Sequence, residues 1–243
     1  MCYNNIRTFI ESKGVSYVQI RIAYAHQRRQ CLRCKLGRRY DKAVCKNRFF
    51  GCCCNKPFYK RQHLYFTFSA VGTAYYAIQQ GAYTNGRKIA EELDFDLFFG
   101  IEEGYGNGKE FLAYGFEPEF LLSRPFLRNA DLNIWAKEIH SVGGFIAYAH
   151  PFRDRDYITN PDEVPNISIV DGIEGYNRGN RDIENEKATR VFGNADTIIT
   201  AGSDLHSTDF DSAYGIETQH RIRSNEELVK TLLERNFRVY LGE

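Results

Sequence analysis

Asp204 and His206 stand two positions apart in the stretch GSDLH, shortly after the apolar run DTIIT. In an extended segment, residues i and i+2 project to the same face. A carboxylate oxygen and an imidazole nitrogen are standard ligands of zinc, manganese and iron, so the pair predicts a metal site. The alternative is that Asp204 caps a turn and His206 is a surface loop residue.

Other polar side chains follow apolar runs in the same way. Glu102 ends FFGIE, His150 ends FIAYAH and Asn177 ends GIEGYN. Each is either a ligand or substrate contact, or simply the first solvated residue after a strand. Arg153, in AHPFR, is placed to meet a phosphate, since a guanidinium matches phosphate oxygens in a bidentate way; a solvated loop arginine is the competing interpretation.

From about residue 84 onward, the pattern predicts short strands that alternate with helices. The expected helices are GRKIAEEL, ADLNIWAKEIHSVGG with Asp131 near its start and glycines after its end, DIENEKATRVFG capped by Gly193, and SNEELVKTLLERN with a capping box of Ser224 and Glu227. Strand and helix in alternation predict a parallel α/β architecture. In a β/α barrel the carboxyl ends of the strands converge on one mouth, where the polar residues above would meet.

The order G-I-E, A-H-P, G-I-E-x-Y-N and G-S-D-x-H resembles the PHP family, the polymerase and histidinol phosphatase domains, over about residues 84–243. The resemblance implies a distorted (β/α)7 TIM-like barrel with up to three divalent ions, zinc, manganese or iron, at its mouth. It implies that Glu102 bridges two metals, that His150 binds one, and that Asp204 and His206 complete the set. Where several family members have a histidine, this chain has Glu110.

The first 65 residues differ from the rest in composition. They hold 15 lysines and arginines against two acidic residues, and all seven cysteines lie within the first 54 residues. The remaining chain carries 17 basic and 29 acidic residues. The H-x-H and T-D-H motifs with which the PHP pattern begins are absent from residues 1–90. The barrel is therefore expected to be incomplete, with residues 1–83 as an atypical segment and 84–243 as the PHP-like part.

Three interpretations compete for residues 1–83. The first is a zinc-binding or nucleic-acid-binding arm, since Cys31 and Cys34 form a C-x-x-C among many basic residues. The second is a divergent half of the barrel that uses other ligands. The third is an out-of-frame segment joined to an authentic PHP portion. The cysteine and arginine excess, the scarcity of acids and the lack of periodicity favour the third.

The resemblance implies a metal-dependent phosphoesterase, in which metal-activated water hydrolyses a small phosphorylated substrate that contacts Arg153 and Asn177. The alternatives are a catalytically inactive PHP relic that serves as a binding or regulatory module and, more weakly, a basic cysteine-rich nucleic-acid-binding protein. The sequence has no apolar run of membrane-spanning length and no signal-peptide pattern at its start, so a cytoplasmic protein without a membrane partner is expected.

Overall fold

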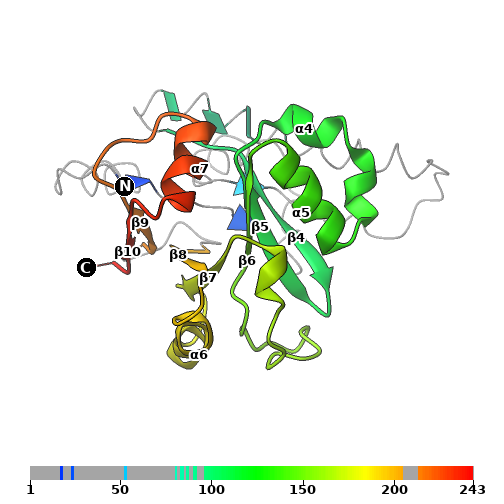
Figure 1. Cartoon of the computed structure of the whole chain (residues 1–243), viewed down its shortest axis with the longest axis vertical. Helices are drawn as coiled ribbons and strands as arrows, with labels where there is room; N and C mark the ends of the chain where they lie inside the picture. The colour runs from blue at the N-terminus through cyan, green and yellow to red at the C-terminus, as the bar shows by residue number, and fades with distance from the viewer. Residues whose placement is uncertain are drawn as a thin grey trace, which may run out of the picture.

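The computed structural model describes residues 96–204 and 213–242, together with residues 17–18, 23–24, 52–53, 80, 83–84, 86–87 and 90–91. Its main feature is a five-stranded sheet in the order β4-β5-β6-β7-β8 (Figure 1). The strands are β4 (Gly100–Gly106), β5 (Lys109–Tyr114), β6 (Phe145–Tyr148), β7 (Gly172–Asn177) and β8 (Ile198–Gly202).

The sheet is mixed. Strand β5 runs antiparallel to both β4 and β6, whereas β6, β7 and β8 are parallel. The predicted parallel order is therefore right only for the last three strands, and no closed (β/α)7 barrel is found in the described part of the chain. The cause is a two-residue turn at Asn107 and Gly108, whose φ angles of 55° and 76° are both positive. Asn-Gly favours this turn, which joins neighbouring strands as a hairpin.

Within residues 96–204 and 213–242 the chain also forms α-helices and 3-10 turns. They are α4 (Pro118–Leu122), η1 (Pro125–Asn129), α5 (Leu132–Ser141), η2 (Ile167–Ile169), α6 (Asp182–Phe192) and α7 (Asn225–Leu233). The helices predicted over α5, α6 and α7 are confirmed, and residues 86–87 and 90–91 of the expected first helix are helical.

The helix starts follow from local hydrogen bonding. The Asp131 carboxylate accepts the backbone N–H of Ile134 at 3.0 Å at the start of α5, and the Ser224 hydroxyl accepts that of Glu227 at 3.1 Å at the start of α7. These bonds satisfy N–H groups that have no partner within the helix. The predicted capping box is only half formed, because the Glu227 side chain accepts from Arg223 instead of Ser224.

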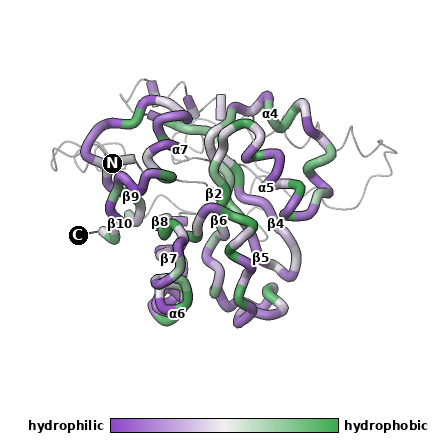
Figure 2. The backbone as a smooth tube through the Cα atoms, viewed as in Figure 1, coloured by the Kyte–Doolittle hydropathy of each residue, from purple (hydrophilic) through white to green (hydrophobic). Residues whose placement is uncertain are grey.

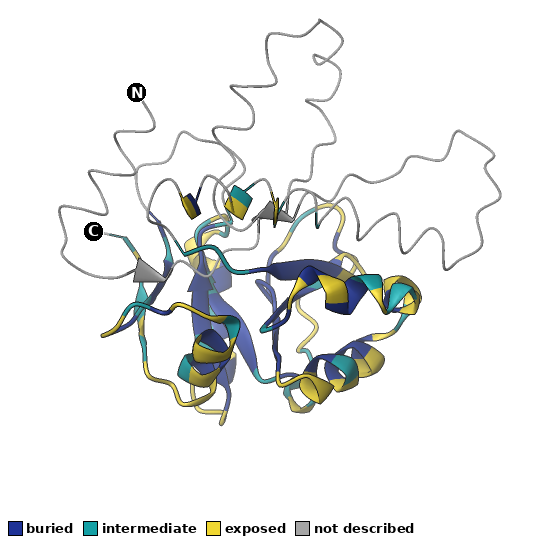
Figure 3. Ribbon diagram, turned by 90° about the horizontal axis from the view of Figure 1, so that it is seen from above, coloured by how far each residue is buried: buried dark blue, intermediate teal, exposed yellow. Residues whose placement is uncertain are grey.

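The core lies between the sheet and its helices. Trp135 of α5 packs on Phe111 of β5, with ring centroids 5.3 Å apart, and Phe192 of α6 stacks on Phe152. The apolar residues of α5 recur at helical spacing and are buried, as expected of a helix lying on a sheet: Leu132, Trp135, Ala136 and Ile139. Hydrophobic segments lie in the strands between the helices (Figure 2). The central strands are buried, whereas the outer faces of the helices are exposed (Figure 3).

Two smaller sheets complete the described strands. Strands β1 (Tyr17–Val18) and β10 (Arg238–Tyr240) flank β9 (Gly215–Glu217), and β2 (Ala23–Tyr24) pairs with β3 (Cys52–Cys53). The other residues of the first 79 lie outside the described part, so the interpretations of that segment and the boundary at residues 83 and 84 stay predictions. No helix of the described residues combines the length and apolar character that crossing a membrane requires.

Candidate metal centre

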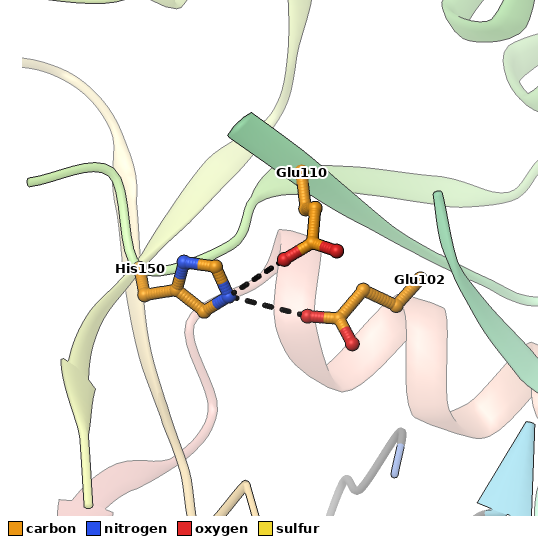
Figure 4. Close-up of side chains that lie close together, drawn as sticks. All are labelled: Glu102, Glu110 and His150. Carbon is orange, nitrogen blue, oxygen red and sulfur yellow. Dashed lines mark hydrogen bonds and ion pairs between the residues drawn. The ribbon is translucent and has the colours of Figure 1, made fainter. Parts of the chain in front are cut away.

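Three side chains with metal-binding atoms converge at one edge of the sheet (Figure 4). The Nε2 atom of His150 lies 3.3 Å from a carboxylate oxygen of Glu102 and 3.4 Å from one of Glu110. One ligand atom of each residue lies within 4.8 Å of the other two. The side chains of His150 and Glu102 are almost fully buried, and that of Glu110 is 17% exposed.

The two glutamates are brought together by the register of the hairpin. Glu102 of β4 lies opposite Leu112 of β5, and Gly104 lies opposite Glu110. Since side chains alternate between the two faces of a strand, Glu102 and Glu110 project from the same face as diagonal neighbours, which long side chains can bridge. The absence of a side chain at Gly104 leaves space beside Glu110.

His150 follows the end of β6, where the backbone N–H of Ala149 still donates to the carbonyl of Glu110 at 3.0 Å. His150 itself has a φ of 29°, a conformation that non-glycine residues rarely adopt. Asp204, which follows β8, has a φ of 46°. Residues held in such conformations cluster at functional sites. Both predicted ligands thus lie where a parallel strand ends and the chain turns sharply.

The electrostatics of the three residues are dominated by burial. Burial raises the pKa of Glu102 to about 8, against the hydrogen bond from His150, and the negative charges of Glu110 and Asp204 act in the same direction as burial. Burial and the charge of Arg153 oppose protonation of His150, but its hydrogen bonds to Glu102 and Glu110 raise its pKa to about 10.

The second carboxylate oxygen of Glu102, Oε2, is buried and has no hydrogen-bond partner among the residues that the structure describes. An unsatisfied buried carboxylate oxygen is costly, so it calls for a partner beyond the described residues, and a bound ion is one such partner. Two carboxylates and an imidazole form a donor set suited to zinc, manganese or iron. The residues present therefore fit a divalent ion.

Beside this group lies a second cluster, centred on the guanidinium of Arg153. Its Nη2 atom donates to Asp204 Oδ2 at 2.5 Å and to Asn177 Oδ1 at 2.8 Å, and its Nε atom donates to Asn180 Oδ1 at 2.8 Å. Although burial acts against the charged form, the carboxylate of Asp204 raises the pKa of Arg153. Arg153 is 8% exposed and Asn177 only 1%. The guanidinium is thus buried and permanently charged, and it is held by three oxygen atoms, of which that of Asp204 carries the balancing negative charge.

Glu174 of β7 links this cluster to the sheet. Its Oε2 atom accepts from the side-chain amide of Asn177 at 2.7 Å, and burial raises its pKa. The carboxylate lies against Gly202 of β8, where an added Cβ would come within 1.9 Å of Glu174 Oε1. A side chain at Gly202 would therefore force the Glu174 carboxylate to move from its present position.

The loop from Pro151 to Glu163, which carries Arg153, is anchored at both ends. The buried ammonium of Lys109 donates to the carbonyl oxygens of Pro151 and Glu163, at 3.4 and 2.8 Å. Beyond Arg153, the buried carboxylate of Glu184 accepts from the Asp154 backbone N–H at 3.1 Å and from the Arg155 side chain at 2.8 Å. These bonds fix the backbone on either side of the guanidinium.

The structure divides the predicted site residues into two groups. Glu102 and His150 lie together, and Asp204 and Asn177 both contact Arg153. His206 lies outside the described residues. Glu110, which departs from the family's histidine, joins Glu102 and His150. The signal that points to it is the Asn-Gly dipeptide, because the hairpin fixes which residue of β5 faces Glu102.

No protein-family model and no curated protein matches the sequence. Two solved structures are similar to part of the chain. One, from Bifidobacterium adolescentis, is described as a candidate metal-dependent phosphoesterase; it shares 13% identity and a TM-score of 0.45 over 65% of this chain and 82% of its own. The other is a two-domain protein from Bacteroides vulgatus containing a predicted PHP-like metal-dependent phosphoesterase, with 17% identity and a TM-score of 0.48 over 66% of this chain and 49% of its own.

Proposed function

We propose that the chain is a metal-dependent phosphoesterase whose ion is held by Glu102, Glu110 and His150. The observation that carries this proposal is the buried, unpartnered Oε2 atom of Glu102 within a Glu-Glu-His cluster. The motifs AHPFR, GIEGYN and GSDLH point in the same direction, since they resemble those of PHP phosphoesterases. His206 remains a further predicted ligand from the sequence.

A divalent ion supplies Lewis-acid polarisation of a phosphate oxygen and lowers the pKa of a bound water to near neutrality. The chain contributes ligands fixed by strand register, a mostly buried site, and the positive charge of Arg153 next to the ligand cluster. A preorganised positive charge in a poorly solvated site stabilises negative charge that develops on a phosphate. Small phosphate monoesters or diesters are the substrate class for which these groups are suited.

The proposal is tested by metal content and turnover measured on the same preparation. The full chain, dialysed against Mn²⁺ and analysed for bound metal, is expected to retain the ion and to hydrolyse p-nitrophenyl phosphate or its bis ester. Glu110→Gln should lose both properties, while Glu186→Gln, on the exposed face of α6, should keep both. A wild-type chain that binds no divalent ion would refute the proposal.

A second candidate function, a non-catalytic metal-binding PHP relic, is favoured by one observation. The guanidinium expected to meet the phosphate is already bonded to Asp204, Asn177 and Asn180. If this bonding persists with substrate, the ion has no partner for the phosphate. Retention of the ion with no turnover of either ester would support this candidate over the phosphoesterase.

A further inference from the structure

The oxygen atoms around the Arg153 guanidinium are of the kinds that hold hard metal ions. One is a carboxylate oxygen, Asp204 Oδ2, and two are amide oxygens, Asn177 Oδ1 and Asn180 Oδ1. Carboxylate and amide oxygens are preferred ligands of magnesium, calcium and manganese. Here all three accept hydrogen bonds from one organic cation.

The Asn177 side chain of this cluster is also held by groups other than Arg153. The backbone N–H of Gly179 donates to Asn177 Oδ1 at 2.7 Å, and the Asn177 amide nitrogen donates to Glu174. A side chain at Gly179 would be crowded, because an added Cβ would lie 3.1 to 3.2 Å from the polar atoms of Asn177, Arg153 and Asp204. The oxygens thus line a tight, buried site that admits one cation.

We propose that Arg153 is a built-in cation that occupies a second cation position and thereby limits the centre to a single divalent ion. This inference rests on the proposed function, because the single ion is the one held by Glu102, Glu110 and His150. Asp204 then serves the guanidinium and is not a ligand of that ion. The positive charge that a second ion would bring to the substrate is supplied by the chain itself.

Two physical reasons support this assignment. The guanidinium satisfies the carboxylate of Asp204 at 2.5 Å, so a second ion would first have to break a buried, charge-assisted hydrogen bond. It would then lie close to a guanidinium that cannot lose its proton, since arginine stays charged in proteins. By contrast, the Glu102 cluster presents an unpartnered oxygen to its ion.

The test counts Mn²⁺ ions by equilibrium dialysis and elemental analysis. Wild type is expected to bind one ion, and Arg153→Met two, because the oxygen-lined position opens when the guanidinium is removed. Arg153→Lys should bind one, as its ammonium keeps a cation among the same oxygens. The double variant Arg153→Met with Asp204→Asn should also bind one, because the second site then lacks its carboxylate. The matched control is Arg190→Met on the exposed face of α6, which should bind one ion.

Asp204→Asn alone tests the same idea in a chain that keeps Arg153, in case Arg153→Met fails to fold. It should leave the Mn²⁺ count at one and the affinity within about threefold of wild type, whereas removal of a true ligand costs on the order of 100-fold or more. A ligand-sized loss overturns the inference.

The outcomes separate the inference from the proposed function. One ion in both wild type and Arg153→Met, or two in wild type, overturns the inference and leaves the phosphoesterase proposal standing. A wild-type chain that binds no Mn²⁺ or other divalent ion overturns both. Thermal unfolding with and without Mn²⁺ gives a second readout, because Arg153→Met with a second site should gain more stability from the ion than wild type does.

Discussion

The two halves of the central sheet position polar side chains in different ways. In the antiparallel half, β4 and β5 place Glu102 and Glu110 side by side through cross-strand register. In the parallel half, Asn177 and Asp204 come from the carboxyl ends of β7 and β8. Strand β6 belongs to both halves, and the chain that follows it supplies His150 to the first and Arg153 to the second.

The two polar clusters also differ in how completely their atoms are satisfied. In the antiparallel half, the cluster of Glu102, Glu110 and His150 leaves a buried oxygen of Glu102 without a partner among the described residues. In the parallel half, the guanidinium of Arg153 bonds to Asp204, Asn177 and Asn180. Under the proposed function, the antiparallel or hairpin half holds an external ion, whereas in the parallel half one of the chain's own charges lies among the oxygens.

The largest effect is expected at Glu110, in the antiparallel half. Glu110→Gln removes one anionic ligand from the hairpin half, and we expect the affinity for Mn²⁺ to fall on the order of 100-fold or more. Isothermal titration of the full chain measures this change. Asn180→Ala, in the parallel half, should leave the affinity nearly unchanged; an equal loss in both variants would show that the halves form one ligand set.

The next largest effect is expected at the turn that sets the hairpin register. At Gly108, φ is 76° and an added Cβ would approach the carbonyl oxygen of Tyr157 to 2.3 Å. Gly108→Ala should therefore lower the free energy of unfolding by about 3 kcal/mol, since strain from positive φ adds to a steric clash. Urea unfolding measures it.

Gly143 is the matched control for this change, because its φ is 72° and an added Cβ would meet no atom within 4 Å. Gly143→Ala should cost only about 1 kcal/mol, the penalty of the backbone conformation alone. Equal losses at the two glycines would mean that the contact with Tyr157 plays no part in holding the turn.

A smaller effect, which depends on pH, is expected at Glu184 in the parallel half. Burial acts to raise the pKa of this carboxylate, but hydrogen bonds from Arg181, Asp154 and Arg155 lower it below its ordinary value. Its stabilising contribution is therefore present above the pKa of the unfolded chain and is lost as pH falls through the folded value. Glu184→Gln should cost about 1–3 kcal/mol near neutral pH.

The measurement is urea unfolding of wild type and Glu184→Gln at about pH 7 and about pH 3. The difference between the two proteins should shrink at the lower pH, because about pH 3 lies below the ordinary pKa of a glutamate in the unfolded chain. Glu186→Gln, an exposed substitution on the same helix, should show little difference at either pH. A difference that stays constant with pH would argue against a charged Glu184 as the anchor of the loop.

The smallest effect is expected at Asp131, which caps the helix that covers the hairpin half. Asp131→Ala should lower the free energy of unfolding by about 1 kcal/mol, as is usual for an N-cap, without weakening Mn²⁺ binding. This variant separates loss of stability from loss of the site. A large loss of ion affinity here would indicate that the hairpin half responds to any destabilisation and not to its ligands.

Much of the local structure was predictable from the sequence. The apolar spacing of Leu132, Trp135 and Ile139 and the N-cap at Asp131 predict α5 as it occurs. The strand endings at His150 and Asp204 were likewise predictable, because each follows an apolar run. These features depend on neighbours within a few residues, which a single sequence displays.

The features that depend on pairing were not predicted. Alternating strand and helix patterns predict parallel strands. That prediction does not take account of Asn107 and Gly108, whose turn makes β4 and β5 antiparallel. From the sequence alone, Glu110 is a departure from the family pattern, and its pairing with Glu102 is not evident. The hydrogen bond between Arg153 and Asp204 could not be predicted from the sequence either. Sequence spacing does not say which of two possible partners a buried charge will take.

The contact of Glu174 with Gly202 has a consequence for how the chain can change over evolution. The glutamate of GIEGYN occupies the room in which any larger residue at the start of GSDLH would stand. A substitution at Gly202 is therefore tolerable only together with a shorter or redirected side chain at position 174. We expect the two positions to vary as a pair among homologous sequences, although they belong to different motifs.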